Sequence, residues 1–299
     1  MRGTDFVAEF SRKGLPAWEA AALSLARQGL LTPWPFVDLP LSDGPDTVVL
    51  KVASDVLAVG PLEDYVRLPL TPQTAQSIAN LSGSLLTTPW LEYKIWQAAQ
   101  TKLQPVAMVP NRGADLEQYS AHSRAISDQL YAISQSTGRD MRGILTAGHK
   151  KGVVVGNFYK PNKVLIFGWY RPPPAPDVFD DRQPMTSPSR QPIQPKSNVH
   201  GDFYVDYSHG VRLVGPVAIV NGQPMETVAV YQHPSLSRLV SNEGPLRIPR
   251  YPSPVPPAAS RIAPATGPQA ALPPLGWVRT TPSVYQHSLD VLDRQRRRI

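Results

Sequence analysis

The chain has 299 residues, a net charge of +7, no cysteine, and 34 prolines, about twice the usual share. The absence of cysteine excludes disulfides, thiolate nucleophiles and cysteine-ligated zinc or iron–sulfur centres. No run reaches the roughly 18 apolar residues of a membrane span, and the N-terminus lacks the apolar core of a signal peptide. We therefore expect a soluble protein, cytoplasmic or associated with a particle.

The first part of the chain, residues 1–138, is predicted to be helical, with helices over 15–29, 71–83, 88–103 and 115–136. Two of them open with a Thr-Pro pair, where threonine caps free N–H groups and proline needs no hydrogen-bond donor. One segment breaks the pattern. TVVLKVASDVLAVG (47–60) is rich in β-branched residues and is predicted to form a hairpin that turns at Ser54-Asp55.

Residues 139–244 are predicted to be strand-rich, because short β-branched runs such as KGVVVGNF and KVLIFGWY alternate with turn residues. A Pro-rich loop at 171–195 is inserted between these runs. Helices that are segregated from strands indicate an α+β fold, with N-terminal helices packed on a mainly antiparallel or mixed sheet. We expect this domain to span 1–244. Residues 245–299 are predicted to form an extended Pro-rich arm with a basic C-terminus.

The stretch VHGDFYVDYSHGVRLV (199–214) holds the densest group of polar and aromatic residues. On an extended strand Tyr204 and Asp206 would share one face with His200, and a turn at Ser208 would return His209 towards them. Histidine and aspartate can form an acid–base pair or bind a divalent metal. His200, Asp206 and His209 are therefore candidate catalytic residues, and a divalent metal of unassigned ligands is the candidate cofactor. The alternative is a polar structural hairpin.

A second candidate segment, TAGHKKGVVVGN, places His149 and Lys150 between two glycines. An imidazole and a cation in such a turn can act on an anionic group, so His149 is a fourth catalytic candidate and Lys150 a substrate-binding one. The alternative is a basic β-turn on the surface. The segment lacks the spacing of a P-loop, and the chain has no G-x-S-x-G nucleophile motif.

Several blocks between Phe6 and Leu246 resemble, in the same order, a family of bacterial proteins without an established activity. They are DYVRLPLTPQTAQSIANLSGSLLTT, LTAGHKKGVVVGN, VLIFGWYRP, PIQPKSNVHGDFYVDYSHGVRLV and LVSNEGPL. The resemblance implies a site built from the polar residues of these blocks: His149, Lys150, Trp169, His200, Tyr204, Asp206, Ser208 and His209. Trp169 and Tyr204 join Lys150 as substrate-binding candidates. The resemblance also implies an acidic residue in relatives at the position of Gly152 and a histidine at that of Tyr170, so the site here is partly degenerate.

Two functions are compatible with these features. The first is a hydrolase-like domain of a bacterium or phage that acts on a cell-wall polymer through a His/Asp site. The alternative is a non-catalytic structural protein of a phage or another large assembly that binds neighbouring subunits through its Pro-rich arm. The positive charge favours an anionic polymer as partner. No module that reads nucleic-acid sequence is present, so sequence-specific nucleic-acid binding is not expected.

Overall fold

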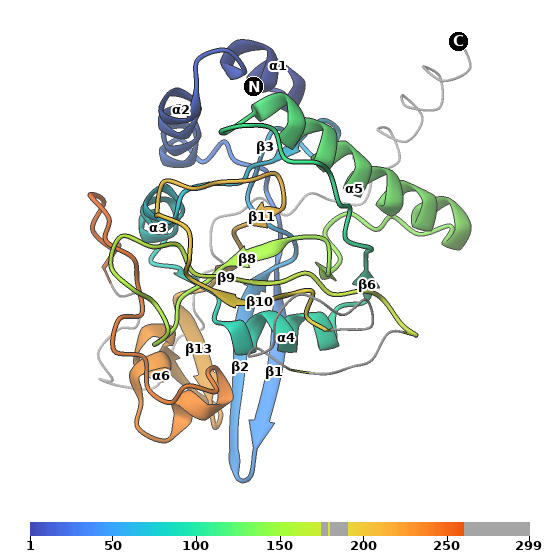
Figure 1. Cartoon of the computed structure of the whole chain (residues 1–299). Helices are drawn as coiled ribbons and strands as arrows, with labels where there is room; N and C mark the ends of the chain where they lie inside the picture. Colours follow the sequence, from blue (N-terminus) through green and yellow to red (C-terminus); the bar gives the residue numbers. More distant parts are fainter. Residues whose placement is uncertain (175–178, 180–190, 260–299) are drawn as a thin grey trace. The chain divides into compact units, whose positions relative to one another are not determined.

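Figure 1 shows the computed structural model of the chain, which describes residues 1–174, 179 and 191–259. These residues form helices together with antiparallel and mixed sheets, so the predicted α+β class is confirmed. Most of the predicted Pro-rich loop and residues 260–299 of the predicted arm lie outside the described residues.

The expected helices are present, and three of them start at the predicted capping residues, but the helix expected over 88–103 ends at Ala98. Thr71 accepts a hydrogen bond from the N–H of Thr74 and starts one helix, and Thr88 accepts from the N–H of Leu91 and starts another. Asp115 caps the longest helix in the same way. The helices of the described residues are α1 (Gly3–Phe10), α2 (Leu15–Arg27), α3 (Pro72–Leu81), α4 (Pro89–Ala98), α5 (Leu116–Thr137), α6 (Thr227–Gln232) and the 3-10 helix η1 (Leu236–Leu239).

The larger sheet is antiparallel and centres on β2, which pairs with β1 along its whole length as the long hairpin of Figure 1. The other side of β2 pairs with β12 and β13, so the strand order is β14-β13-β2-β12-β5 with β1 added on β2. The strands are β1 (Phe36–Asp43), β2 (Asp46–Ala53), β5 (Leu85–Leu86), β12 (Leu213–Val214), β13 (Val217–Val220) and β14 (Gln223–Glu226).

The second sheet has the order β10-β9-β8-β11 and brings two distant motifs together. β11 runs parallel to β8, with His209 opposite Lys151 and Gly210 opposite Gly152. The segment GHKKG therefore lies beside the segment SHG. The strands are β8 (Lys151–Val153), β9 (Ile166–Gly168), β10 (Gln194–Ser197) and β11 (His209–Gly210).

Two short pairs complete the strands of the described residues. β3 (Ala58–Val59) pairs with β4 (Val66–Arg67) in antiparallel fashion, and β6 (Thr101–Lys102) pairs with β7 (Thr146–Ala147) in parallel.

Three predictions on local structure are wrong. The hairpin over 47–60 does not form, because β2 pairs with β1 rather than with the residues that follow it, and β3 at 58–59 pairs with β4. β1, an edge strand that contains Pro40, was not predicted from the sequence. Residues 1–138 are not only helical, since they contain β1 to β6. The polar stretch 202–208 is not a strand but a run of turns that ends at His209, so its side chains do not alternate between two faces.

The first part of the expected arm, residues 245–259, packs on the domain. Tyr251 is buried, its hydroxyl donates to the carbonyl of Val154 at 2.7 Å, and it accepts from the N–H of Leu165 at 2.9 Å. In the described part of the chain, no helix is long and apolar enough to cross a membrane.

Candidate active site

The buried core contains an ion pair next to a histidine. Asp55 follows β2, and its Oδ2 accepts two hydrogen bonds from the guanidinium of Arg67, at 3.0 and 2.7 Å. Its Oδ1 lies 2.9 Å from Nε2 of His149. All three side chains are almost completely buried. Burial raises the pKa of Asp55, but the charge of Arg67 and the hydrogen bonds from His149 and Arg67 outweigh burial and hold that pKa far below its ordinary value.

This arrangement fixes the tautomer of His149. The Asp55 carboxylate only accepts hydrogen bonds, so Nε2 of His149 carries the proton and donates. Burial lowers the pKa of His149 in spite of Asp55, which favours the neutral ring. The other nitrogen, Nδ1, is then an acceptor, and it has no hydrogen-bond partner among the described residues. The ring therefore presents a basic nitrogen with its orientation fixed by Asp55.

His149 lines a small cavity with room for about one water molecule. One acidic and three basic side chains contribute to its walls: Glu92, His149, Lys150 and Arg212. The remaining lining residues are Val56, Trp96, Ala147, Gly148, Gly152, Gly168, Trp169 and Tyr170. Gly152 leaves room for Glu92 here, because a Cβ atom at this position would lie 2.8 Å from Oε1 of Glu92 and would force that side chain to shift.

Glu92 and Arg212 both line this cavity, and the charge of Arg212 influences the pKa of Glu92. Burial raises the pKa of Glu92, and the Arg212 charge and a hydrogen bond from Thr87 offset only part of that effect. Arg212 donates to the carbonyls of Ala53 and Thr146 through its terminal nitrogens. Its Nε has no partner among the described residues. The cavity thus combines a base, a carboxyl shifted towards its protonated form and a buried cation, the groups that acid–base catalysis uses.

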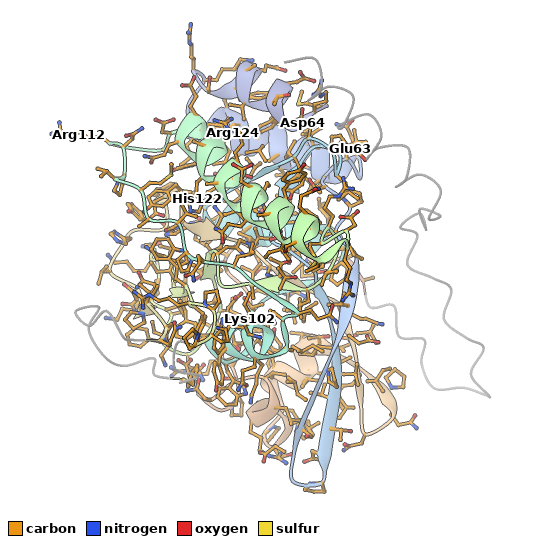
Figure 2. The ribbon with its side chains drawn as sticks, turned by 90° about the vertical axis from the view of Figure 1, so that its right-hand side faces the viewer. Glu63, Asp64, Lys102, Arg112, His122 and Arg124 are labelled. Carbon is orange, nitrogen blue, oxygen red and sulfur yellow. The ribbon has the colours of Figure 1, made fainter. Side chains whose placement is uncertain are left out.

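Lys150 connects this cavity to α5. Its Nζ donates to the carbonyl of Tyr207 at 2.6 Å and to Nδ1 of His122 at 3.0 Å, and Nε2 of His122 lies 3.0 Å from the carbonyl of Val106. Figure 2 labels His122 on α5. Burial, reinforced by Arg67, lowers the pKa of Lys150 to about 7. The ammonium group of Lys150 is therefore directed into the protein rather than towards a substrate.

The polar stretch before β11 forms a second cluster. Oδ1 of Asp206 accepts from the N–H of Ser208 at 2.7 Å and from the Ser208 hydroxyl, while Oδ2 accepts from the Tyr204 hydroxyl at 3.2 Å. Nε2 of His209 lies 3.6 Å from Oδ2 of Asp206, beyond hydrogen-bond distance. The His200 ring stacks on Tyr204 with centroids 3.9 Å apart.

The charges of this second cluster depend on its burial. Burial lowers the pKa of His209 to about 4, against the opposing effect of Asp206, so the ring is neutral at pH 7. Burial raises the pKa of Asp206, but His209, Lys151 and the Ser208 hydrogen bonds outweigh it and lower the pKa to about 2. Since His209 is neutral at pH 7, Lys151 and Ser208 keep this carboxylate ionised.

The predicted site residues therefore fall into two groups. His200, Tyr204, Asp206 and His209 are brought together, although by turns rather than by a strand. His149, Lys150 and Trp169 line the cavity instead. The cavity-lining residues do not include His200, Asp206 or His209, so the four catalytic candidates do not face one common hollow. The alternative of a surface turn at His149 and Lys150 is wrong, because both residues are buried.

The described residues lack the ligand set of a metal site. Within residues 1–174, 179 and 191–259, no group of three or more histidine, aspartate or glutamate side chains is placed to hold a metal ion. The divalent metal expected from the sequence thus has no ligand set in this part of the chain.

Sequence reasoning missed Asp55, Arg67, Glu92 and Arg212. Arg212 stands inside the quoted polar stretch and could have been noticed there. Asp55 interrupts a strongly apolar run, and a charged residue in such a run signals a paired buried charge as well as a turn. Arg67 and Glu92 carry no comparable signal, because only the folded chain brings them near His149.

Comparison of the chain with protein-family models, with curated proteins and with solved structures found no match.

Proposed function

We propose that this domain is a hydrolase whose reaction centre is the cavity lined by Glu92, His149 and Arg212. One observation carries the proposal: His149 donates from Nε2 to a buried, ionised Asp55, while its Nδ1 is unpartnered among the described residues and the ring lines the cavity. Burying so many charged groups is costly unless they are paired, and strongly perturbed groups gather at functional sites. Gly152 and Tyr170, where the resemblance implies altered site residues, line the same cavity.

The chemistry follows from the pKa shifts. Nδ1 of His149 takes a proton from a water molecule as the water oxygen attacks the electrophilic atom of the scissile bond. Asp55 stabilises the resulting imidazolium, and Arg212 stabilises negative charge on the substrate. Glu92 in its protonated form gives a proton to the leaving group. The imidazolium proton then restores Glu92, so one water molecule is consumed for each bond broken.

We propose a bacterial cell-wall polymer as the first substrate to test, because a chain of charge +7 attracts acidic polymers. The test measures release of soluble fragments from labelled peptidoglycan, with a simple activated ester as a second substrate. His149→Ala should lower the turnover rate about 100- to 10,000-fold, the usual contribution of a general base. His233→Ala is the matched control, since His233 ends α6 and lines neither the cavity nor the second cluster.

Two outcomes contradict this proposal. One is the absence of turnover of both substrates by the wild-type protein. The other is loss of activity in His209→Ala while His149→Ala keeps it, which would move the reaction centre to the Asp206 cluster. Circular dichroism and the melting temperature of each variant separate loss of chemistry from loss of fold.

A second candidate function is the structural protein of a large assembly. The observation in its favour is the small volume of the cavity, which admits about one water molecule and no substrate group without opening. This alternative predicts a large oligomer in light scattering and no turnover, whereas the hydrolase predicts turnover that depends on His149.

A further inference from the structure

A groove of about 330 Å³ lies beside the second cluster and is separate from the cavity. Its walls come from the start of α2, the loop that leads into α5, and residues 203–206. Leu15, Pro110 and Phe203 supply apolar surface, and Tyr204 and Asp206 supply polar atoms. The volume falls in the range of small-ligand sites, which bind mostly through apolar walls and a few placed polar groups.

Asp206 gives this groove its charge. It is the one side chain with a full charge among the described residues that line the groove. Arg112 belongs to the loop before α5 but does not line the groove, and Figure 2 shows its side chain extending away from the molecule. Asp206 is therefore the anionic group of the groove wall in a chain whose net charge is positive, and Lys151, the nearby cation, does not line the groove.

The Asp206 carboxylate keeps capacity for one more donor. Each carboxylate oxygen can accept about two hydrogen bonds. Oδ1 uses both on Ser208, whereas Oδ2 accepts only from the Tyr204 hydroxyl, since His209 lies 3.6 Å away. A cationic donor in the groove would complete the partners of Oδ2 with a charge-assisted hydrogen bond.

The rim of the groove exposes apolar side chains. Phe203 is 81% exposed and lines the groove, and Val109, next to the lining residue Pro110, is 87% exposed. They are the two most exposed large apolar residues in the described part of the chain. Exposed apolar surface around a pocket is typical of a binding site, and aromatic faces attract ammonium groups.

We propose that this groove binds a primary ammonium group whose carrier has an apolar C–H surface, such as the methylene chain of lysine or the C–H face of a sugar ring. Oδ2 of Asp206 accepts from the ammonium, the rings of Phe203 and Tyr204 flank it, and Leu15 and Pro110 contact the C–H surface of the carrier. Such a group occurs on a lysine side chain of a peptide and on an amino sugar. This inference is independent of the hydrolase, because the groove and the cavity share no lining residue.

The experiment uses isothermal titration calorimetry on the full chain with two probes, trilysine and a glucosamine trimer. Each has a neutral counterpart with acetylated amines. At least one amine should bind, and its acetylated form should bind at least about tenfold more weakly, as expected for loss of a charge-assisted hydrogen bond. The probe that binds identifies the source of the ammonium group.

Variants locate the binding in the groove. Asp206→Asn should weaken binding about tenfold or more, and Phe203→Ala about two- to fivefold. Asp202→Asn is the matched control: this nearby carboxylate accepts from Gln73, does not line the groove, and its loss should leave the affinity unchanged. His149→Ala should also bind normally, which separates this inference from the hydrolase.

Three results would overturn the inference. They are no binding of either amine at about 1 mM, equal binding of the acetylated probes, and unchanged affinity in both Asp206→Asn and Phe203→Ala. Phe203 is on the surface, so its variant tests the groove even where Asp206→Asn alters the turn around Ser208.

Discussion

Two carboxylate–histidine pairs in this molecule look alike in composition and differ in geometry. Asp55 and His149 are 2.9 Å apart and hydrogen-bonded, and Arg67 adds a second partner to the carboxylate. Asp206 and His209 are 3.6 Å apart, and the carboxylate is held by a hydroxyl and a backbone N–H instead. The Asp55 side chain is 4% exposed and that of Asp206 is 13% exposed.

This difference teaches that residue types alone do not assign a role. In the first pair the aspartate orients the ring, and a ring nitrogen is available for proton transfer. In the second pair the histidine is a buried neutral neighbour, and the carboxylate is the group that reaches a groove. One arrangement favours chemistry and the other favours binding.

The largest expected effect comes from breaking the first pair. Asp55→Ala leaves Arg67 as an uncompensated buried charge, so the free energy of unfolding should fall by about 3–5 kcal/mol. Asp206→Ala should cost less, about 1–2 kcal/mol, because it removes hydrogen bonds of a partly exposed group. Urea unfolding of both variants measures the difference. Equal losses would contradict the contrast between the two pairs.

The free energy of unfolding should rise with pH in the alkaline range, because burial lowers the pKa of Lys150, which lines the cavity. The pKa of Lys150 is about 7 in the folded chain and 10.5 in an unfolded one. Between these values the unfolded state binds more protons, so stability rises with pH, by about 1.4 kcal/mol per unit. From pH 7 to 9 the gain is about 2 kcal/mol, because Lys150 is already half-deprotonated in the folded chain at pH 7. Unfolding curves at both pH values measure it, and Lys150→Met should show a smaller gain; an equal gain would contradict the assignment.

Acid should lower the free energy of unfolding through His209, which lies near the groove residue Asp206. The pKa of His209 is lowered from 6.5 to about 4, so its contribution to stability is present above pH 6.5 and is lost as pH falls towards 4. The loss between pH 6.5 and 5 is about 2 kcal/mol. His122, with its pKa lowered to about 2, acts in the same direction. Comparing acid unfolding of wild type and His209→Gln isolates the share of His209. The same acid slope in both proteins would refute it.

The smallest expected effect concerns Phe203. Its ring is 81% exposed, so Phe203→Ala should change the free energy of unfolding by less than about 0.5 kcal/mol. Thermal melting checks this value. A loss above 1.5 kcal/mol would mean that Phe203 supports the fold rather than a ligand site, a threshold about three times the usual surface effect.

Local signals predicted where three helices begin, because capping residues act within one turn, whereas α1 and α6 were not predicted. Thr71, Thr88 and Asp115 begin helices as expected, and Gly138 ends the longest one in the left-handed conformation. The strands were harder, since β2 finds partners both next to it in sequence and far beyond it. The β11–β8 pairing that joins SHG to GHKKG is a long-range contact that no local pattern encodes.

In the candidate site, too, the sequence predicted only the residues that a local motif marks. His149 and Asp206 stand in conspicuous polar motifs, so the sequence identified them. Their partners come from elsewhere: Asp55 lies at the end of a strand, and Glu92 lies on a helix among apolar residues. Which histidine receives an orienting carboxylate is decided by tertiary packing, and spacing along the chain does not report it.

The close approach of Glu92 to Gly152 makes these two positions interdependent. A Cβ atom at 152 would lie 2.8 Å from Oε1 and 3.1 Å from Cγ of Glu92, so a side chain there requires Glu92 to move or to become smaller. Gly152→Asp alone crowds the Glu92 side chain, whereas Gly152→Asp with Glu92→Ala moves the carboxyl group from a helix to a strand. Over evolutionary time residues 92 and 152 are therefore expected to change together, because the space between them holds only one carboxyl group.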